Sequence, residues 1–329
     1  MSNFKRLCLL SVATGGILAT SASAQGQNYY SREKYEAVLD RRQPAYDPEP
    51  IRLGAFLVDS SLNGSATYTD NVQATENNKI SDTIVRIGAD IAARTNWSVH
   101  EIGVDVSAYR SEYIDIGDES ANDLRARLRG RLDVNRNVSI GASVFAQDIV
   151  EARTDLANAV GLDAPVEYTR MGGSLEANYQ SDRFRWYNSV DVTEENFKDG
   201  QQAGTGIIID QDYRDNTVTS GRSRLSYALS PNVAVYTQGT VRETSYDQDQ
   251  LLGGALRSRD SSGYTAAVGV DFELNSLVRG DVNVGYLSEN KDDPYFKDVD
   301  GVSVDGRVQW FPTRLTTVGF KAGRRVVDI

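Results

Sequence analysis

Three features of the sequence predict an all-β fold, a transmembrane antiparallel up-and-down β-barrel of about 14–16 strands. The segment from Asp82 to Arg94 alternates apolar residues with polar or small ones, as a strand with one apolar face does. This alternation recurs about a dozen times, in runs long enough for a tilted strand to cross a bilayer. Short turn signals alternate with longer polar connections along the chain, which is typical of such barrels.

The first residues have the pattern of a secretory signal peptide, which we expect to span residues 1–24. Lys5 and Arg6 precede an apolar stretch from Leu7 to Ala19, and Ala22-Ser23-Ala24 supplies small residues for cleavage. The chain's single cysteine, Cys8, lies inside this leader, so the mature chain has no disulfide. A lipoprotein cysteine is the alternative for Cys8, but apolar residues still follow it.

We divide the remainder into a periplasmic N-terminal segment, residues 25–51, and an outer-membrane β-barrel domain, residues 52–329. The first is polar, contains three prolines and shows no sustained period. Charged residues make up 25% of the chain and the mean hydropathy is −0.43. A barrel accommodates this polarity because only one face of each strand meets lipid. The net charge of −11 argues against binding to nucleic acid.

Two kinds of connection separate the expected strands. Tight-turn compositions occur at residues 95–96, 135–137, 181–183, 230–232, 275–276 and 312–313. Longer polar connections lie near residues 73–81, 114–122, 152–166, 197–214, 246–261 and 289–300. A β-propeller or sandwich is the rival fold, because propeller blades repeat at a similar period. Each unit here divides into two long runs rather than four short ones, which favours barrel hairpins.

In each run, one set of alternate residues is more uniformly apolar than the other, and we expect that set to face lipid. Leu124, Leu128 and Leu132 belong to one such face, and Tyr264, Val268 and Val270 to another. Trp97, Trp186 and Trp310 each lie near a short turn, so we expect them to form an aromatic girdle at the periplasmic membrane interface. The alternative is three ordinary core tryptophans.

Charged residues on the opposite parity are the candidate lumen-lining and selectivity residues. Arg125, Arg127, Arg129 and Arg131 occupy alternate positions of one strand and would form a ladder pointing into the barrel. Facing lipid would cost each arginine about 2–4 kcal/mol near the midplane. One interpretation is a track that attracts anions. The alternative, which we favour here, is charge neutralisation by carboxylates on neighbouring strands. The candidate carboxylates are Asp90, Asp105, Asp133, Glu176 and Asp191.

The sequence does not predict an enzyme, a metal site or a cofactor. Its single histidine, His100, follows the first short turn on the lipid-facing parity, so an interfacial histidine with its hydrogen bonds satisfied is favoured over a catalytic base. Sites of the His/Cys type are excluded by composition. The acidic loop from Asp292 to Asp300 lacks the spacing of a dedicated calcium site.

Several short motifs resemble the putative β-barrel porin type 2 family, from about Gly54 to the end of the chain. The matching stretches are Gly54–Val72, Thr95–His100, Glu151–Arg153, Arg214-Asp215, Leu229–Pro231, Arg259–Tyr264, Trp310–Thr313 and Leu315-Thr316. The resemblance implies a bacterial outer-membrane barrel, and some members resemble products encoded beside exopolysaccharide export systems. It implies location and architecture more than activity.

Counting from Arg52, we expect about thirteen strands, the last from Leu315 to Val327. An odd count leaves one sheet edge unpaired, which lipid does not tolerate. We expect either a fragment, with further strands of a longer gene product closing a barrel of about sixteen, or a strand wrongly split or merged near Val58 to Ser65, which makes the true count fourteen.

Two classes of function remain open. The first is a porin-like diffusion channel, or the outer-membrane component of an exopolysaccharide export system. The second is a non-conducting structural or surface-binding barrel. The expected partners are outer-membrane lipids and lipopolysaccharide, the barrel assembly machinery during biogenesis, and polysaccharide or small anionic solutes.

Overall fold

The computed structural model describes residues 48–154, 161–274, 277–313 and 315–323, and apart from two 3-10 turns their regular secondary structure is all β-strand. One 14-stranded antiparallel sheet dominates, with neighbouring strands in the order β1-β2-β3-β4-β5-β6-β7-β8-β11-β12-β15-β16-β17-β18. Its strands are β1 Ile51–Leu53, β2 Phe56–Thr69, β3 Asp82–Thr95, β4 Glu101–Tyr113, β5 Ala121–Asp133, β6 Val138–Val150, β7 Glu167–Gln180, β8 Phe184–Phe197, β11 Asn216–Ser230, β12 Val233–Tyr246, β15 Ser261–Leu274, β16 Val278–Lys291, β17 Val299–Thr313 and β18 Thr316–Gly323. No helix within the described ranges has the length and apolarity to cross a bilayer.

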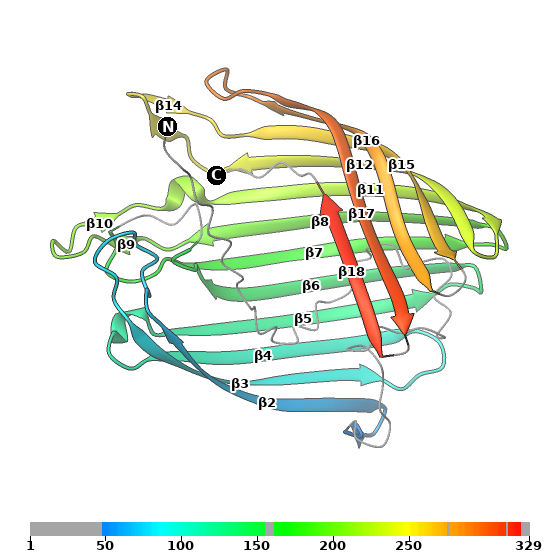
Figure 1. The fold of residues 1–329 in the computed structure, drawn as a ribbon, viewed down its shortest axis with the longest axis horizontal. Coiled ribbons are helices and arrows are strands. Elements are labelled where there is room, and N and C mark those ends of the chain that lie inside the picture. Colours follow the sequence, from blue (N-terminus) through cyan, green and yellow to red (C-terminus); the bar gives the residue numbers. More distant parts are fainter. Residues whose placement is uncertain (1–47, 155–160, 275–276, 314, 324–329) are drawn as a thin grey trace.

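The connections alternate between short turns at one end of the sheet and long loops at the other. The sheet curls back on itself, so that β17 and β18 pass in front of the wall formed by β5–β8 (Figure 1). Five of the six predicted short turns lie at or beside a junction between consecutive strands, and the sixth, at residues 275–276, lies outside the described residues. The long connections gather at the opposite end, hereafter the long-loop end. The loops also carry two-stranded pairs, β9 Gly200–Gln201 with β10 Ile208–Ile209 and β13 Gln250–Leu252 with β14 Ala255–Arg257, and the 3-10 turns η1 Gly117–Glu119 and η2 Asp212–Arg214.

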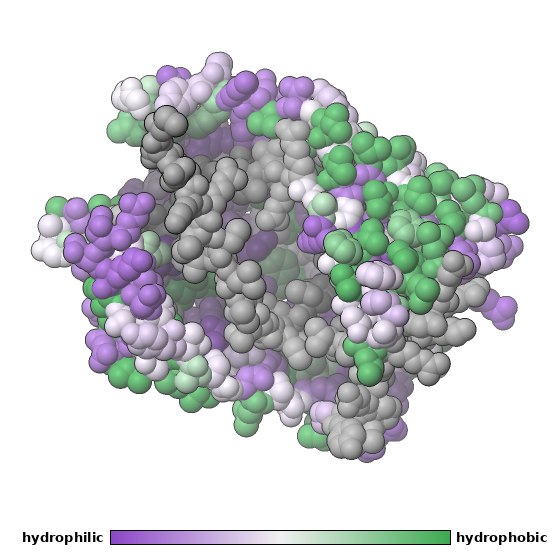
Figure 2. Space-filling model, viewed as in Figure 1, coloured by the Kyte–Doolittle hydropathy of each residue, from purple (hydrophilic) through white to green (hydrophobic). Residues whose placement is uncertain are grey.

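The two faces of the sheet differ as the alternation predicts. The outer face carries apolar side chains that no other part of the described chain covers, such as Leu128, which is 49% exposed, and Val268, which is 59% exposed. Figure 2 shows this hydrophobic surface over β15–β18. Polar side chains occupy the inner face, where Arg224 on β11 reaches Asp281 on β16 across the two intervening strands. Such a reach requires the concave side of the curled sheet.

The main sheet has fourteen strands, as the second alternative expected. β2 runs unbroken from Phe56 to Thr69, so the count of thirteen had merged it with the strand before it. That strand is β1, three residues long, which pairs with β2 across the turn at Gly54 and Ala55. Gly54 adopts a left-handed φ of +59°, which glycine accepts without steric cost. Within the described residues, β1 and β18 are the two edges of the sheet and do not pair with each other.

Four hairpins are closed at the long-loop end by the same device. The side chain of the residue just before the second strand accepts a hydrogen bond from the backbone N–H of the last residue of the first strand. This contact satisfies a donor that the ladder leaves free and fixes where the loop begins. The donor and acceptor pairs are Tyr113 with Ser120, Phe197 with Asp215, Tyr246 with Asp260, and Lys291 with Asp298, at 2.7–3.0 Å.

The long-loop end has a small hydrophobic core of its own. Leu162, Val166 and Phe197 are buried together, and Tyr168 stacks on Phe197 with ring centroids 4.8 Å apart. An isolated bridge between Leu162 and Gln202 ties the β6–β7 loop to the β8–β11 loop. These two loops therefore pack as a unit.

Candidate functional site

The predicted arginine ladder lies on the inner face of β5, with each residue opposite a polar or small neighbour on β4. Arg129 faces Gly103, where a Cβ atom would lie only 2.7 Å from Nε of the arginine. The glycine therefore lets the guanidinium lie flat against the neighbouring strand. Arg125 and Arg127 face Ser107 and Asp105.

The half of the ladder near the short-turn end is neutralised. Arg129 forms an ion pair with Asp105 and approaches Glu101 at 3.5 Å. Arg131 pairs with Asp133 at 3.2 Å and lies 4.0 Å from Glu101. Glu101 is not among the carboxylates predicted from the sequence, although it lies on the inner face of β4 directly opposite Arg131.

The half near the long-loop end has no such partners. Among the described residues, no carboxylate oxygen lies within ion-pair distance of Arg125 or Arg127. Arg127 donates to Ser143 Oγ at 3.2 Å, and its buried Nε has no hydrogen-bond partner in the described chain. The ladder thus divides into a paired and an unpaired half.

The other predicted carboxylates are occupied in different ways. Asp90 accepts hydrogen bonds from Asn63 Nδ2 at 2.7 Å and from the Tyr109 hydroxyl, rather than from an arginine. Asp191 accepts from Ser189 Oγ at 3.2 Å. Glu176 is attracted electrostatically by Arg127 but is not within ion-pair distance of it. Of the predicted carboxylates, only Asp105 and Asp133 contact the ladder.

A second arginine centre, missed in the sequence, lies between β11 and β16. Arg224 pairs with Asp271 at 2.8 Å and with Asp281 at 2.7 Å. Its guanidinium lies 3.4 Å from the ring centroid of Tyr236, whose hydroxyl donates to Asp281 at 2.8 Å. Gly269 lies beneath the ring, where a Cβ would overlap it. The group is largely buried, and its ion pairs tie the strands of one wall together.

A similar arrangement occurs on β3–β5, near the other edge of the sheet. Arg86 pairs with Asp123 at 2.7 Å and lies 4.7 Å from the ring centroid of Tyr109. The Tyr109 hydroxyl donates to Asp90, and the ring covers Gly88, where no Cβ would fit. Glycine, tyrosine, arginine and aspartate therefore recur as a stacked unit in two walls of the sheet.

Two more inner-face arginines resemble the unpaired half of the ladder. Arg222 lies opposite Thr240, and Arg242 opposite Ser220, on the paired strands β11 and β12. Neither has an ion pair within the described part of the chain, and Nε of Arg222 is buried without a hydrogen-bond partner. The sequence could have indicated these arginines as inner-face residues, because Ser220, Arg222, Arg224 and Ser226 occupy alternate positions of β11.

Buried ion pairs join the loops at the long-loop end. Arg214 pairs with Glu151, whose Oε2 lies 3.2 Å from Nη1, and its guanidinium lies 4.0 Å from the Phe197 ring centroid. Arg153 pairs with Glu119 at 2.8 Å. Both arginines belong to short motifs that carried the family resemblance, and the structure shows them holding loops together.

Asp215, the residue after Arg214, is also buried in this loop core. Burial raises the pKa of its carboxyl above the ordinary value, and the hydrogen bond from the Phe197 N–H opposes the shift. Asn196 Nδ2 donates to the same carboxylate at 2.8 Å. Its contacts are those of a structural residue.

His100 belongs to the β3–β4 turn rather than to a strand face. Its backbone N–H donates to Asp133 Oδ2 at 3.1 Å, and its Nδ1 accepts from the Asp133 N–H at the same distance. The residue has a left-handed φ of +68°. These reciprocal bonds account for the histidine structurally.

The three tryptophans lie exposed near the short-turn end. Trp97 is in the β3–β4 turn, Trp186 is close to the start of β8, and Trp310 is close to the end of β17. Trp186 Nε1 donates to Ser223 Oγ at 3.0 Å. A core role does not fit side chains that are close to half exposed.

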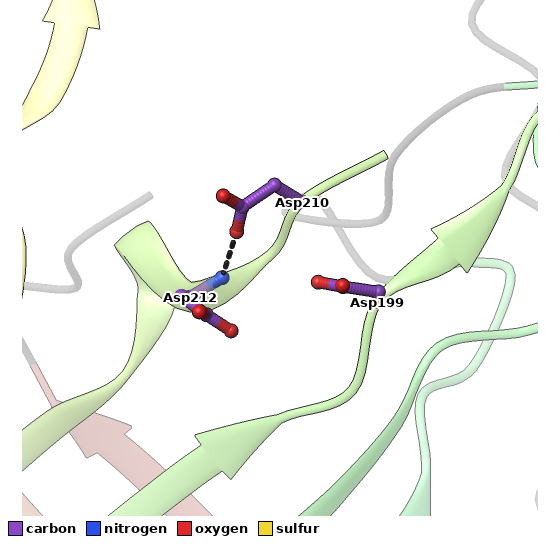
Figure 3. Close-up of side chains that lie close together, drawn as sticks. All are labelled: Asp199, Asp210 and Asp212. Carbon is purple, nitrogen blue, oxygen red and sulfur yellow. Dashed lines mark hydrogen bonds between the residues drawn. The ribbon is translucent and has the colours of Figure 1, made fainter. Parts of the chain in front are cut away.

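The structure brings three carboxylates together in the β8–β11 loop. The ligand atoms of Asp199, Asp210 and Asp212 lie within 4.8 Å of one another, and Asp210 accepts a hydrogen bond from the Asp212 N–H (Figure 3). All three are exposed. In the loop where we considered calcium, Asp293 instead pairs with Arg257 at 3.3 Å and Asp298 closes a hairpin.

Comparison with solved structures shows the same fold. The copper transporter OprC aligns with a TM-score of 0.51 and 14% identity, over 79% of this chain and 47% of that chain. The chain thus spans about half the length of that protein. OmpT of Vibrio cholerae aligns over 79% of this chain and 98% of that chain, with 9% identity and a TM-score of 0.41. The Pseudomonas putida toluene transporter TodX aligns over 78% of this chain and 79% of that chain, with 10% identity and a TM-score of 0.37.

Comparison with sequence families gives a match over most of the chain. A family model described as putative beta-barrel porin 2 covers residues 43–329. No curated protein is similar enough in sequence to be counted as a relative.

Proposed function

Because the chain belongs to the putative beta-barrel porin 2 family, we propose that it is an outer-membrane diffusion channel for small hydrophilic solutes. Membership makes it a porin-like outer-membrane β-barrel, and the diffusion role is the step added here. By the rule for such barrels, the long-loop end faces the exterior and the short turns face the periplasm.

The inner face of the sheet supports the proposal, because it is lined with ionisable groups from one end of the strands to the other. Arg86, Arg127 and Arg131 illustrate this along β3 and β5. Charged side chains of this kind are costly to bury unless water or an opposite charge contacts them. A barrel filled by its own core would be expected to carry apolar inner residues instead.

A second candidate is a surface-binding barrel whose exterior loops contact polysaccharide or lipopolysaccharide. The buried pairs Glu151–Arg214 and Glu119–Arg153 favour it, since they hold several loops in one arrangement. Export of exopolysaccharide rests on the family resemblance alone.

Conductance across a planar lipid bilayer tests the proposal. The protein, purified in detergent from outer membranes, should insert to give stable current steps, and vesicles containing it should swell in small neutral sugars. The control is the same preparation after boiling, which should give neither. Folded protein that migrates as a compact species and still passes no current would overturn the diffusion role and favour the surface-binding barrel.

A further inference from the structure

We propose that Arg125, Arg127, Arg222 and Arg242 form an anion-binding zone in the exterior half of the lumen. Its ligands are solutes that carry several carboxylate or phosphate groups. This inference rests on the proposed channel function, because it assigns a solute class to the same lumen. It identifies the unpaired arginines, rather than the β5 ladder as a whole, as the selective element.

The four arginines lie at matching depths, two on β5 and two on the strand pair β11 and β12. Arg125 is four residues inside the long-loop end of β5, and Arg242 is four residues inside that end of β12. Arg127 and Arg222 are each six residues inside. At about 3.3 Å per residue, this places the zone roughly 13–20 Å along the strands from the exterior end.

None of the four arginines of this zone forms an ion pair within the described chain, and two of them have a buried donor without a partner. The buried Nε atoms of Arg127 and Arg222 find no acceptor within the described chain. Buried donors are normally satisfied, so an unsatisfied pair that faces a lumen points to an external acceptor. A guanidinium matches carboxylate and phosphate groups with two parallel hydrogen bonds.

Spacing within each pair suits a solute with more than one anionic group. Arg125 and Arg127 are two residues apart on one face, roughly 7 Å along the strand. Arg222 and Arg242 are diagonal neighbours across β11 and β12, about 7–8 Å apart at the backbone. Two like charges held this close, without a carboxylate between them, attract oligoanions more strongly than single anions.

The acidic exterior loops do not cancel this field. At physiological ionic strength the Debye length is about 8 Å, shorter than the path from the loop end to the arginines. Several loop carboxylates are also engaged, for example Asp293 with Arg257 and Glu151 with Arg214. The loops therefore affect entry more than binding inside the lumen.

Reversal potentials in a potassium chloride gradient test the zone directly. The wild-type channel should prefer chloride, and R125Q/R127Q/R222Q/R242Q should lower the chloride-to-potassium permeability ratio at least threefold. Inorganic pyrophosphate and trigalacturonate should each block the wild-type current and block the quadruple variant at least tenfold less well. The matched control is D105N/R129Q, which removes a neighbouring ion pair without changing net charge and should leave both properties unaltered.

The outcomes separate this inference from the channel proposal. A conducting channel whose selectivity and block survive the quadruple substitution overturns the anion zone alone. A silent but folded protein overturns the channel, and calorimetry of detergent-solubilised protein with pyrophosphate then tests the zone by itself. Heat release with wild type that is lost in the quadruple variant and retained in D105N/R129Q supports the zone, and no heat with wild type overturns it. Block by only one of the two probes identifies the anionic group that the zone accepts.

Discussion

Two strands each carry a pair of neighbouring arginines that share a face but differ in their surroundings. On β11, Arg224 contacts two aspartates and a tyrosine ring, whereas Arg222, two residues away, has no ion pair among the described residues. On β5, Arg129 is paired with Asp105 while Arg127 is bound only to Ser143 Oγ. Residue type and face are therefore insufficient to assign a role to a lumen arginine, because the neighbouring strands decide it.

The paired arginines serve the fold, and the unpaired ones are left available to solutes. A guanidinium buried between carboxylates holds several strands together, and removing it leaves charges without compensation. A guanidinium without a carboxylate contributes little to folding and creates a positive potential. Substitutions at the two kinds of site should therefore have opposite consequences for stability and for transport.

The largest contrast should come from replacing each arginine of β11 by methionine. R224M leaves Asp271 and Asp281 adjacent and unpaired, so we expect a loss of about 3–5 kcal/mol in the free energy of unfolding. R222M breaks no ion pair and should change it by less than about 0.5 kcal/mol. Urea titrations in lipid vesicles, followed by tryptophan fluorescence, measure both. Equal effects of the two substitutions would remove the distinction on which the comparison rests.

A smaller effect should follow from filling the space beneath Tyr236. In G269A, the added methyl group would overlap the Tyr236 ring and lie 2.7 Å from the Val282 carbonyl, so the ring must leave its place against Arg224 and Asp281. We expect a loss of about 1–3 kcal/mol. G239A, on the adjacent strand β12, meets nothing within 4 Å and is the control. The same urea titration measures both variants, and a neutral G269A would show that the ring is not held by its glycine.

The smallest contrast is expected on β5. Asp105 and Arg129 are each about a third exposed, so R129Q should lose only about 0–1 kcal/mol of stability. R127Q should lose no stability, and it can be slightly more stable than wild type because repulsion from Arg125 is relieved. Thermal unfolding in detergent at low and high salt measures both variants, since high salt should shrink the loss in R129Q and any gain in R127Q. A larger loss for R127Q would mean that it has a structural partner.

Sequence periodicity predicted the parts of the fold that depend on local alternation. Strands such as β3 and β15 show one apolar parity, and the tight turns contain the residues that turns require. β1 could not be predicted in this way, because three residues are too few to show a period. It is defined only by its pairing with β2.

The ion-pair pattern could be predicted only in part. Asp105 and Asp133 were identified as partners because an alternating ladder draws attention to carboxylates of the same parity nearby. Glu151 and Arg214 are 63 residues apart, and no local pattern connects them. The cluster of Asp199, Asp210 and Asp212 depends likewise on how the β8–β11 loop folds back.

The central claim is that adjacent residues of one strand face lipid and a wet interior in turn. Nitroxide labels placed singly at Leu128 and Arg127 of β5 test it most directly, in protein reconstituted into vesicles. The label at position 128 should be relaxed strongly by oxygen, which concentrates in hydrocarbon, and the label at position 127 by a water-soluble nickel complex. The opposite ranking, or equal access of the nickel complex to both positions, would contradict the account.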